Sequence, residues 1–202
     1  RQQLSQRRKE EDFEISPLLE LGWRQGELQI PLSAVSSRGL ESLLRRYTLP
    51  VRDVQRFDQL PIPFRAVATD MESGAPVVMD HGDLALALRS SMSAPGVFSP
   101  TEVNGRMLGD GGLVNNLPID VARALGADVV IAVNIGTPPG GRETLNSAVG
   151  LTAQMLNLLT EQNVQRSLAT LRPDDVLIAP ALGQLSSGDF DRGTTFFSLG
   201  EA

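Results

Sequence analysis

The sequence predicts an α/β fold in which strands and helices alternate along the chain and pack in layers. Two continuous apolar runs, DVVIAVNIG at residues 128–136 and DVLIAPAL at residues 175–182, are typical of strands buried on both faces of a parallel sheet. Between them, residues 143–171 carry apolar side chains at helical spacing, which predicts a long helix. The apolar face of this helix comprises Leu145, Val149, Met155, Leu156, Leu159 and Leu168.

The N-terminal part of the chain contains shorter elements. Residues 1–14 are strongly charged and are expected to form a solvated segment that is helical in part. GELQIPL at residues 26–32 predicts a short strand. Residues 38–46 place three leucines at helical spacing, which predicts an amphipathic helix that ends before Pro50.

A hairpin and a capped helix come next. PFRAVATD at residues 63–70 alternates as a strand does, and the turn-rich MESGA joins it to PVVMD at residues 76–80, so the pair predicts a hairpin. Asp83 is a suitable N-cap for the helix DLALALRSSM. That helix is expected to end before Pro95, since the residue preceding a proline disfavours helical geometry.

A second hairpin leads into a glycine-rich turn. EVNGRML contains Asn-Gly at its centre, the strongest short hairpin signal, and its second arm runs directly into GDGG. Pro118 is placed to begin a helix, LPIDVARALGA, with Gly126 as its C-cap.

Composition limits the kind of protein. The chain has 202 residues, of which 41% are hydrophobic and 21% charged, so a single globular domain over residues 1–202 is expected. The net charge of −6 argues against a nucleic-acid partner, which would need a basic surface for phosphates. The chain contains no cysteine and a single histidine, so a disulfide framework and a zinc site are both disfavoured.

Asp110 is the main candidate for chemistry. Gly109, Gly111 and Gly112 surround it, which indicates tight local geometry, and it ends a predicted strand, where open α/β sheets place their ligands. Two interpretations remain open on composition alone. The carboxylate either caps the next segment in an Asx-type turn or takes part in a reaction.

Several familiar sites do not fit the sequence. A Ser-His-Asp triad needs a histidine, and His81 lies in DHGD, which predicts an exposed turn. A dinucleotide site requires G-x-G-x-x-G after a strand, and the glycines near Asp110 do not have that spacing.

Taken together, these motifs resemble a family. SMSAPGVF at residues 91–98, a hairpin, and then DGGLVNNLP resemble the C-terminal half of patatin-like phospholipases, particularly bacterial members. The resemblance continues upstream in FDQLPIPFRAVATDMESGAPVV and downstream in IDVARALGADVVIAVNIGTP.

This resemblance implies a patatin-like three-layer fold with a mostly parallel central sheet flanked by helices. It implies a lipid acyl hydrolase in which Asp110 accepts the proton of a serine hydroxyl, without an intervening imidazole. The substrate would be a phospholipid or fatty acyl ester met transiently at a membrane surface, with no cofactor, no metal and no nucleic acid. Met92, Val97 and Phe98 are candidates for lining the acyl pocket.

The sequence departs from the family pattern in one respect. The family's nucleophile lies in G-x-S-x-G, and no serine among the 202 residues has glycine at both −2 and +2. We expect the serine and its oxyanion loop to precede Arg1, so that the domain is incomplete and inactive alone. The missing segment, or self-association, would then be needed to cover the sheet. For Ser90, Ser91 and Ser93 we favour helix capping over nucleophilic roles.

Two alternatives remain. The chain is either a non-catalytic patatin-like fragment acting as an interaction module or, less in keeping with its motifs, a haloacid-dehalogenase-like phosphatase with GDGG as its magnesium loop. The phosphatase would need D-x-D, and TDMES has Glu72 where the second aspartate belongs. Both a bacterial cytoplasmic location and export to the outer membrane or cell surface with an attached barrel agree with the resemblance.

Overall fold

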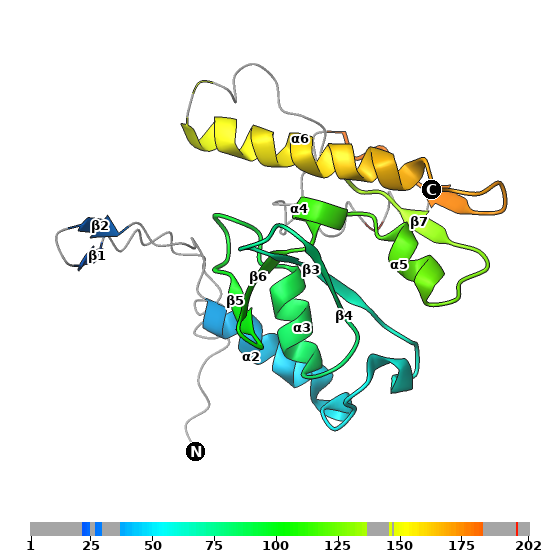
Figure 1. The fold of residues 1–202 in the computed structure, drawn as a ribbon, viewed down its shortest axis with the longest axis horizontal. Helices are drawn as coiled ribbons and strands as arrows, with labels where there is room; N and C mark the ends of the chain where they lie inside the picture. Colours follow the sequence, from blue (N-terminus) through cyan, green and yellow to red (C-terminus); the bar gives the residue numbers. More distant parts are fainter. Residues whose placement is uncertain are drawn as a thin grey trace.

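The computed structural model describes residues 22–24, 27–29, 37–136, 146, 148–183 and 197 (Figure 1). Near the N-terminus, β1 (Gly22–Arg24) and β2 (Glu27–Gln29) form an antiparallel pair. The strand predicted at residues 26–32 is therefore confirmed at residues 27–29, and its other residues lie outside the described ones. The charged segment predicted at residues 1–14 lies outside the described residues.

The next elements are helical. Helix α2 (Ser37–Thr48) confirms the amphipathic helix predicted at residues 38–46. Two single turns of 3-10 helix follow, η1 (Leu49–Val51) and η2 (Phe57–Gln59). The second turn places the Phe57 ring in the core, where it is fully buried.

Four strands form the sheet that carries the site, in the order β4-β3-β6-β5. Their bounds are β3 (Ala66–Asp70), β4 (Pro76–Met79), β5 (Thr101–Val103) and β6 (Arg106–Asp110). Helices and strands together confirm the α/β class, but every neighbouring pair in this sheet is antiparallel. The mostly parallel arrangement is therefore wrong for the described sheet. Turns of a few residues join β3 to β4 and β5 to β6, and parallel neighbours would need long crossovers.

Local signals set the turns of both hairpins. In the β5–β6 turn, Asn104 and Gly105 have φ of 52° and 77°, as two-residue turns between twisted strands require. Asp83 caps α3 (Leu84–Ser91), because its Oδ1 accepts hydrogen bonds from the amides of Ala85 and Leu86 at 2.9 and 3.2 Å. Both hairpins and the cap were predicted from the sequence.

The first core joins residues of α3 and of the antiparallel sheet. Figure 1 shows α3 lying along this sheet. The apolar surface of this core is removed from water on both sides, and this burial is the main source of stability for the layer. The buried members are Phe57, Ala66, Ala68, Met79, Ala87 and Leu108.

The C-terminal half contains the remaining elements, which are α4 (Gly112–Asn115), α5 (Ile119–Ala124), β7 (Ile131–Val133), α6 (Ala148–Leu168) and β8 (Val176–Ile178). Strands β7 and β8 pair in parallel, and the connection between them contains α6. The helix predicted from Pro118 is α5, which ends at Ala124 with Leu125 as its C-cap. Gly126, the predicted C-cap, lies one residue further on, and its φ of 94° suits a glycine directly after a helix C-cap. A second core, centred on Val130, Ala132 and Val164, holds α6 against β7.

The prediction that β7 and β8 are buried on both faces is wrong. Ile131 and Val133 are 65% and 50% exposed, and all three residues of β8 are exposed. The described residues supply only two strands to this sheet, and α6 packs against the face that carries Ala132. On α6, Met155 and Leu159 are also exposed, so much of the predicted apolar face has no covering layer among the described residues.

Helix α6, with 21 residues, is the longest helix among the described residues. Among the described residues, no helix combines the length and the apolar composition that a crossing requires.

Candidate active site

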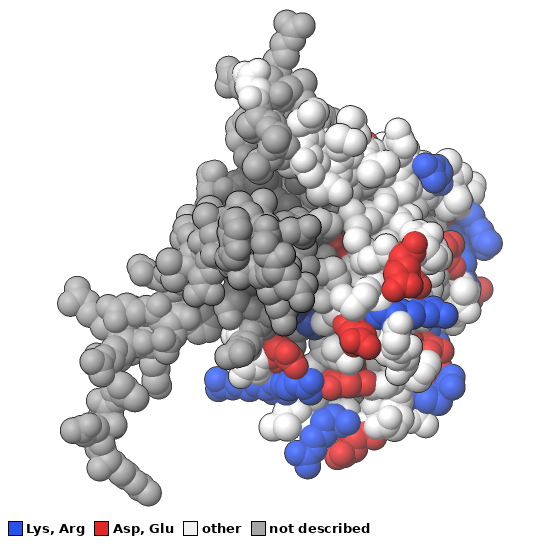
Figure 2. All heavy atoms as spheres, turned by 60° about the vertical axis from the view of Figure 1, so that its left-hand side comes forward, with Lys and Arg blue, Asp and Glu red and all other residues white. Residues whose placement is uncertain are grey.

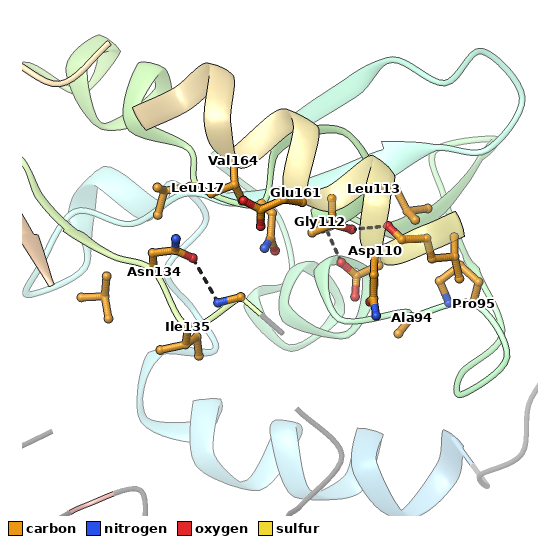
Figure 3. Close-up of a pocket in the computed structure, with 16 residues that line it drawn as sticks. Ala94, Pro95, Asp110, Gly112, Leu113, Leu117, Asn134, Ile135, Glu161 and Val164 are labelled. Atoms are coloured by element: carbon orange, nitrogen blue, oxygen red, sulfur yellow. Dashed lines mark hydrogen bonds between the residues drawn. The ribbon is translucent and has the colours of Figure 1, made fainter. Parts of the chain in front are cut away.

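Asp110 ends β6 at the edge of a cavity of about 550 Å³. The cavity lies between the DGG turn, the end of β7 and one side of α6, and Figure 3 shows the labelled residues that surround it. Its walls are mixed. Leu113, Ile135 and Val164 are apolar, while Glu161 and Asn134 are polar.

The main chain of Asp110 is fixed on both sides. The Asp110 amide donates to the Ser93 carbonyl oxygen at 3.1 Å, and the Asp110 carbonyl oxygen accepts a hydrogen bond from the Thr69 hydroxyl at 2.6 Å. The next amide, that of Gly111, donates to the Ser91 carbonyl oxygen at 3.1 Å. Strand β3 and the loop after α3 therefore hold the turn from opposite directions.

Neighbouring atoms lie so close to the glycines around Asp110 that a Cβ would have no room there. A Cβ on Gly111 would overlap the Val67 carbonyl group, and a Cβ on Gly112 would lie 2.9 Å from Asp110 Oδ1. A Cβ on Gly109 would lie 2.5 Å from the Met71 sulfur, which sits on a flexible side chain. The motif thus lets β6 pass close to β3 and leaves room for the carboxylate.

The Asp110 carboxylate is largely buried and, among the described residues, accepts one hydrogen bond. Asp110 Oδ1 accepts a hydrogen bond from the Gly112 amide at 2.7 Å, as the Asx-type interpretation requires. Burial raises the pKa of Asp110 above its ordinary value, and the Gly112 hydrogen bond opposes that rise. Within the described part of the chain, Asp110 joins none of the ion pairs. The same group therefore forms an Asx turn and borders the cavity.

Arg89 holds the loop that supports Asp110. Its side chain is buried, and its Nη1 donates to Ser93 Oγ at 2.6 Å. Its Nη2 donates to the Ser99 carbonyl oxygen at 3.1 Å, and its guanidinium lies 5.0 Å from the Phe98 ring centroid. Desolvation lowers the pKa of Arg89. Sequence reasoning missed this role, although an arginine within the apolar helix LALALRSS was a usable signal.

Asn163 of α6 holds the other side of the turn. Its Nδ2 donates to the Gly112 carbonyl oxygen at 2.9 Å, and its Oδ1 accepts from the Asn116 amide at 2.8 Å. Sequence reasoning missed Asn163 as well. No local pattern could have found it, because about fifty residues separate it from the motif that it contacts.

Among the described residues, none of the remaining candidates has a side-chain hydrogen bond to the Asp110 carboxylate. Ser90 and Ser93 donate their hydroxyls to the helix carbonyls of Leu86 and Arg89, both at 2.8 Å, which agrees with capping roles. None of the three acyl-pocket candidates lines the cavity beside Asp110. Of these candidates, Met92 and Val97 are both 38% exposed, and the Phe98 ring packs against the Arg89 guanidinium.

Three other polar residues have structural roles, and the exposed turn predicted for His81 is one of them. His81 is exposed and pairs with Asp80 in a turn, at 2.5 Å between Nδ1 and Oδ1. Asp70 caps the β3–β4 turn by accepting from the Glu72 and Ser73 amides. Arg65 pairs with the carboxylate of Asp58 at 2.6 Å.

The fold and the site together define an α/β domain with a partly buried carboxylate at a strand end. The family model for patatin-like phospholipases matches residues 1–123, which include Asp110 and its glycines. Because this match covers more than half of the chain, the chain belongs to the patatin-like phospholipase family.

Individual relatives match shorter stretches. An uncharacterized NTE family protein of Mycobacterium tuberculosis is 40% identical over 110 residues, which cover 53% of this chain and 30% of the relative. Patatin-like phospholipase domain-containing protein 7 of Mus musculus is 41% identical over 85 residues, covering 41% of this chain and 6% of the relative. Patatin-like phospholipase domain-containing protein 6 of Homo sapiens is 38% identical over 85 residues, which cover 41% of this chain and 6% of the relative. The matches therefore span about a third of the mycobacterial relative and a small part of the mammalian ones.

Proposed function

We propose that this chain is part of a lipid acyl hydrolase of the phospholipase A or esterase type, with Asp110 as the general base of a Ser-Asp dyad. Family membership supports a lipid hydrolase as the kind of function. The observation that carries the role of Asp110 is its placement, a carboxylate at a strand end beside a cavity with apolar walls. The raised pKa also favours the assignment, since it makes the carboxylate a stronger base toward an alcohol.

The reaction would proceed in two steps. Gly112 occupies Oδ1 of Asp110, which leaves Oδ2 to accept the serine proton as the serine oxygen attacks the ester carbonyl carbon. When the tetrahedral intermediate collapses, the proton moves from Asp110 to the departing alcohol oxygen and an acyl-serine remains. In the second step Asp110 takes a proton from water, the hydroxide attacks the acyl-serine, and the proton returns to the serine oxygen. The carboxylate is regenerated, and neither a metal nor a cofactor is consumed.

The substrate would be a phospholipid or another fatty acyl ester. Leu113, Val133, Ile135 and Leu156 supply apolar walls beside the carboxylate. Entry of an acyl chain into such a cavity is favourable, and the free energy falls in proportion to the apolar area that leaves water. Since such esters reside in bilayers, transient contact with a membrane surface would accompany turnover.

The serine hydroxyl would come from outside the 202 residues, because no G-x-S-x-G occurs within them. The exposed face of β7 is the favoured docking place for the segment that carries it. Val133 and Ile135 are exposed, and both also line the cavity of Asp110. A segment that covered them would bring its own side chains next to the carboxylate.

The test is Asp110→Asn in the intact protein that contains this chain. We expect fluorophosphonate labelling and hydrolysis of a short-chain ester to fall by about 10²–10⁴-fold, because an amide cannot accept the serine proton. The variant should stay folded, since an asparagine oxygen can still accept the Gly112 hydrogen bond.

Asp53→Asn is the matched control, because Asp53 is an exposed aspartate that, within the described residues, pairs with Arg52 alone, at 3.7 Å. It should keep wild-type activity. Full activity in Asp110→Asn would refute the role of Asp110. If the wild-type protein itself neither hydrolyses esters nor reacts with the probe, the chain belongs to a non-catalytic protein.

A further inference from the structure

Helix α4 is the element that presents the Gly112 amide to Asp110. It comprises only Gly112–Asn115, a single turn. Forming one helical turn fixes several dihedral angles for few hydrogen bonds, so a helix of this length depends on contacts from elsewhere. In the structure, α4 packs against α6.

The side chain of Asn163 supplies two of those contacts. If α4 continued as a helix through Asn116, the main-chain amide of Asn116 would donate to the Gly112 carbonyl oxygen. Here the Asn163 amide group lies between them, donating to Gly112 O at 2.9 Å and accepting from Asn116 N at 2.8 Å. A side-chain amide thus bridges both ends of the turn.

This arrangement is specific rather than incidental. Asn163 is 7% exposed, and it is the only buried polar residue on α6 among those described. A buried amide without partners costs about 1–3 kcal/mol, so an apolar residue would be the simpler choice for packing. The Asn163 amide instead binds the Gly112 carbonyl oxygen and the Asn116 amide, at the two ends of the α4 turn.

The position of α4 decides how the Asp110 carboxylate is held. Among the described residues, Gly112 alone donates a hydrogen bond to that carboxylate, and Asn163 binds the carbonyl oxygen of the same residue. A shift of α4 would therefore release Oδ1 or turn the carboxylate away from the cavity.

We propose that Asn163 is a positioning residue, which holds the DGG turn against α6 so that the Gly112 amide orients the carboxylate of Asp110 toward the cavity. The catalytic part of this inference rests on the proposed function of Asp110. The positional part rests on the contacts of Asn163 and can be measured without turnover.

The experiment compares Asn163→Leu with wild type in the intact protein. We expect the Asp110 pKa, followed by carboxyl ¹³C NMR titration, to rise above its wild-type value, because the Gly112 hydrogen bond that opposes the rise is weakened. We expect kcat for a short-chain ester to fall by about 10–100-fold with little change in KM, since the base rather than substrate binding is misplaced.

Leu168→Ala is the matched control. Leu168 lies on the same helix and packs against the second core, but it does not line the cavity. This variant should lose stability and keep both the Asp110 pKa and kcat. An unchanged Asp110 pKa in a folded Asn163→Leu protein would overturn the proposal.

Asn163→Asp serves if the leucine variant does not fold. It keeps the acceptor for the Asn116 amide and loses the donor to Gly112, so hydrogen exchange of the Gly112 amide should become faster than in wild type. Exchange at the wild-type rate would overturn the proposal. If the wild-type protein has no esterase activity, the Ser-Asp assignment fails, and the titration still decides the role of Asn163.

Discussion

At the level of single residues, the space around the DGG turn decides which side chains its positions can carry. Gly111 lies where β6 passes the main chain of β3, and any Cβ there would meet the Val67 carbonyl group. Main-chain atoms of a central strand cannot move aside as a flexible side chain can. Gly111 is therefore needed for the fold, quite apart from what Asp110 does.

We predict that Gly111→Ala destabilises the protein by about 1–3 kcal/mol, the usual cost of overpacking a core. Gly39→Ala is the control, because a Cβ on Gly39 in α2 would meet nothing within 4 Å. That change should stabilise the helix by about 0.5–1 kcal/mol. Urea unfolding of both variants checks the opposite signs, and a neutral effect at Gly111 would contradict the account of the turn.

At the scale of elements, Asp175 joins the two parallel strands. Its carboxylate accepts from the Arg172 amide at 2.7 Å and from the Val130 amide at 2.8 Å, and it pairs with Arg123. The hydrogen bonds from the Arg172 and Val130 amides contribute most to lowering the pKa of Asp175 to about 2, and the Arg123 side chain adds to this effect. The carboxylate thus ties the start of β7 to the start of β8.

The lowered pKa predicts how stability depends on pH. A carboxyl group with a folded pKa below its unfolded value of about 3.9 stabilises the fold at higher pH, and this contribution is lost as pH falls toward 2. Asp175→Asn should therefore be less stable than wild type at pH 7, and the difference should shrink between pH 4 and pH 2. Urea unfolding across this range is the measurement, with exposed Asp174→Asn as the control. A difference that is independent of pH would contradict the role of the Asp175 charge.

Elements with local signals could be predicted from the sequence, and those that depend on distant contacts could not. Asn104-Gly105 fixed one hairpin and Asp83 fixed a helix start, because each signal acts within a few residues. The roles of Arg89 and Asn163 depend on tertiary neighbours, so no spacing rule revealed them. For β7, the apolar run was read correctly as a strand, but its exposure depends on which other elements lie beside it.

At the scale of the whole molecule, charge and apolar surface are unevenly distributed. Figure 2 shows basic and acidic side chains interspersed over the lower part of one face. The upper part of that face, at the height of α6 in Figure 1, is mostly uncharged. Exposed apolar residues on α6 and on the β7–β8 pair include Leu151, Met155, Leu159, Ile131 and Ile178.

This surface predicts that the 202-residue chain, produced alone, self-associates or is poorly soluble. Exposed strand edges with apolar faces are sites of intermolecular pairing. Sedimentation velocity over a concentration series is the measurement, and Ile131→Lys, on an exposed position of β7, should reduce the association. A monomeric chain with a cooperative melt at high concentration would contradict this prediction.

We propose that Asp110 accepts a proton from a serine hydroxyl, and a crystal structure of the intact protein that contains this chain would test this role. We expect a serine Oγ within about 3 Å of Asp110 Oδ2, beside the cavity between α6 and β7. A carboxylate turned into solvent, or without any serine oxygen within hydrogen-bonding distance, would contradict it.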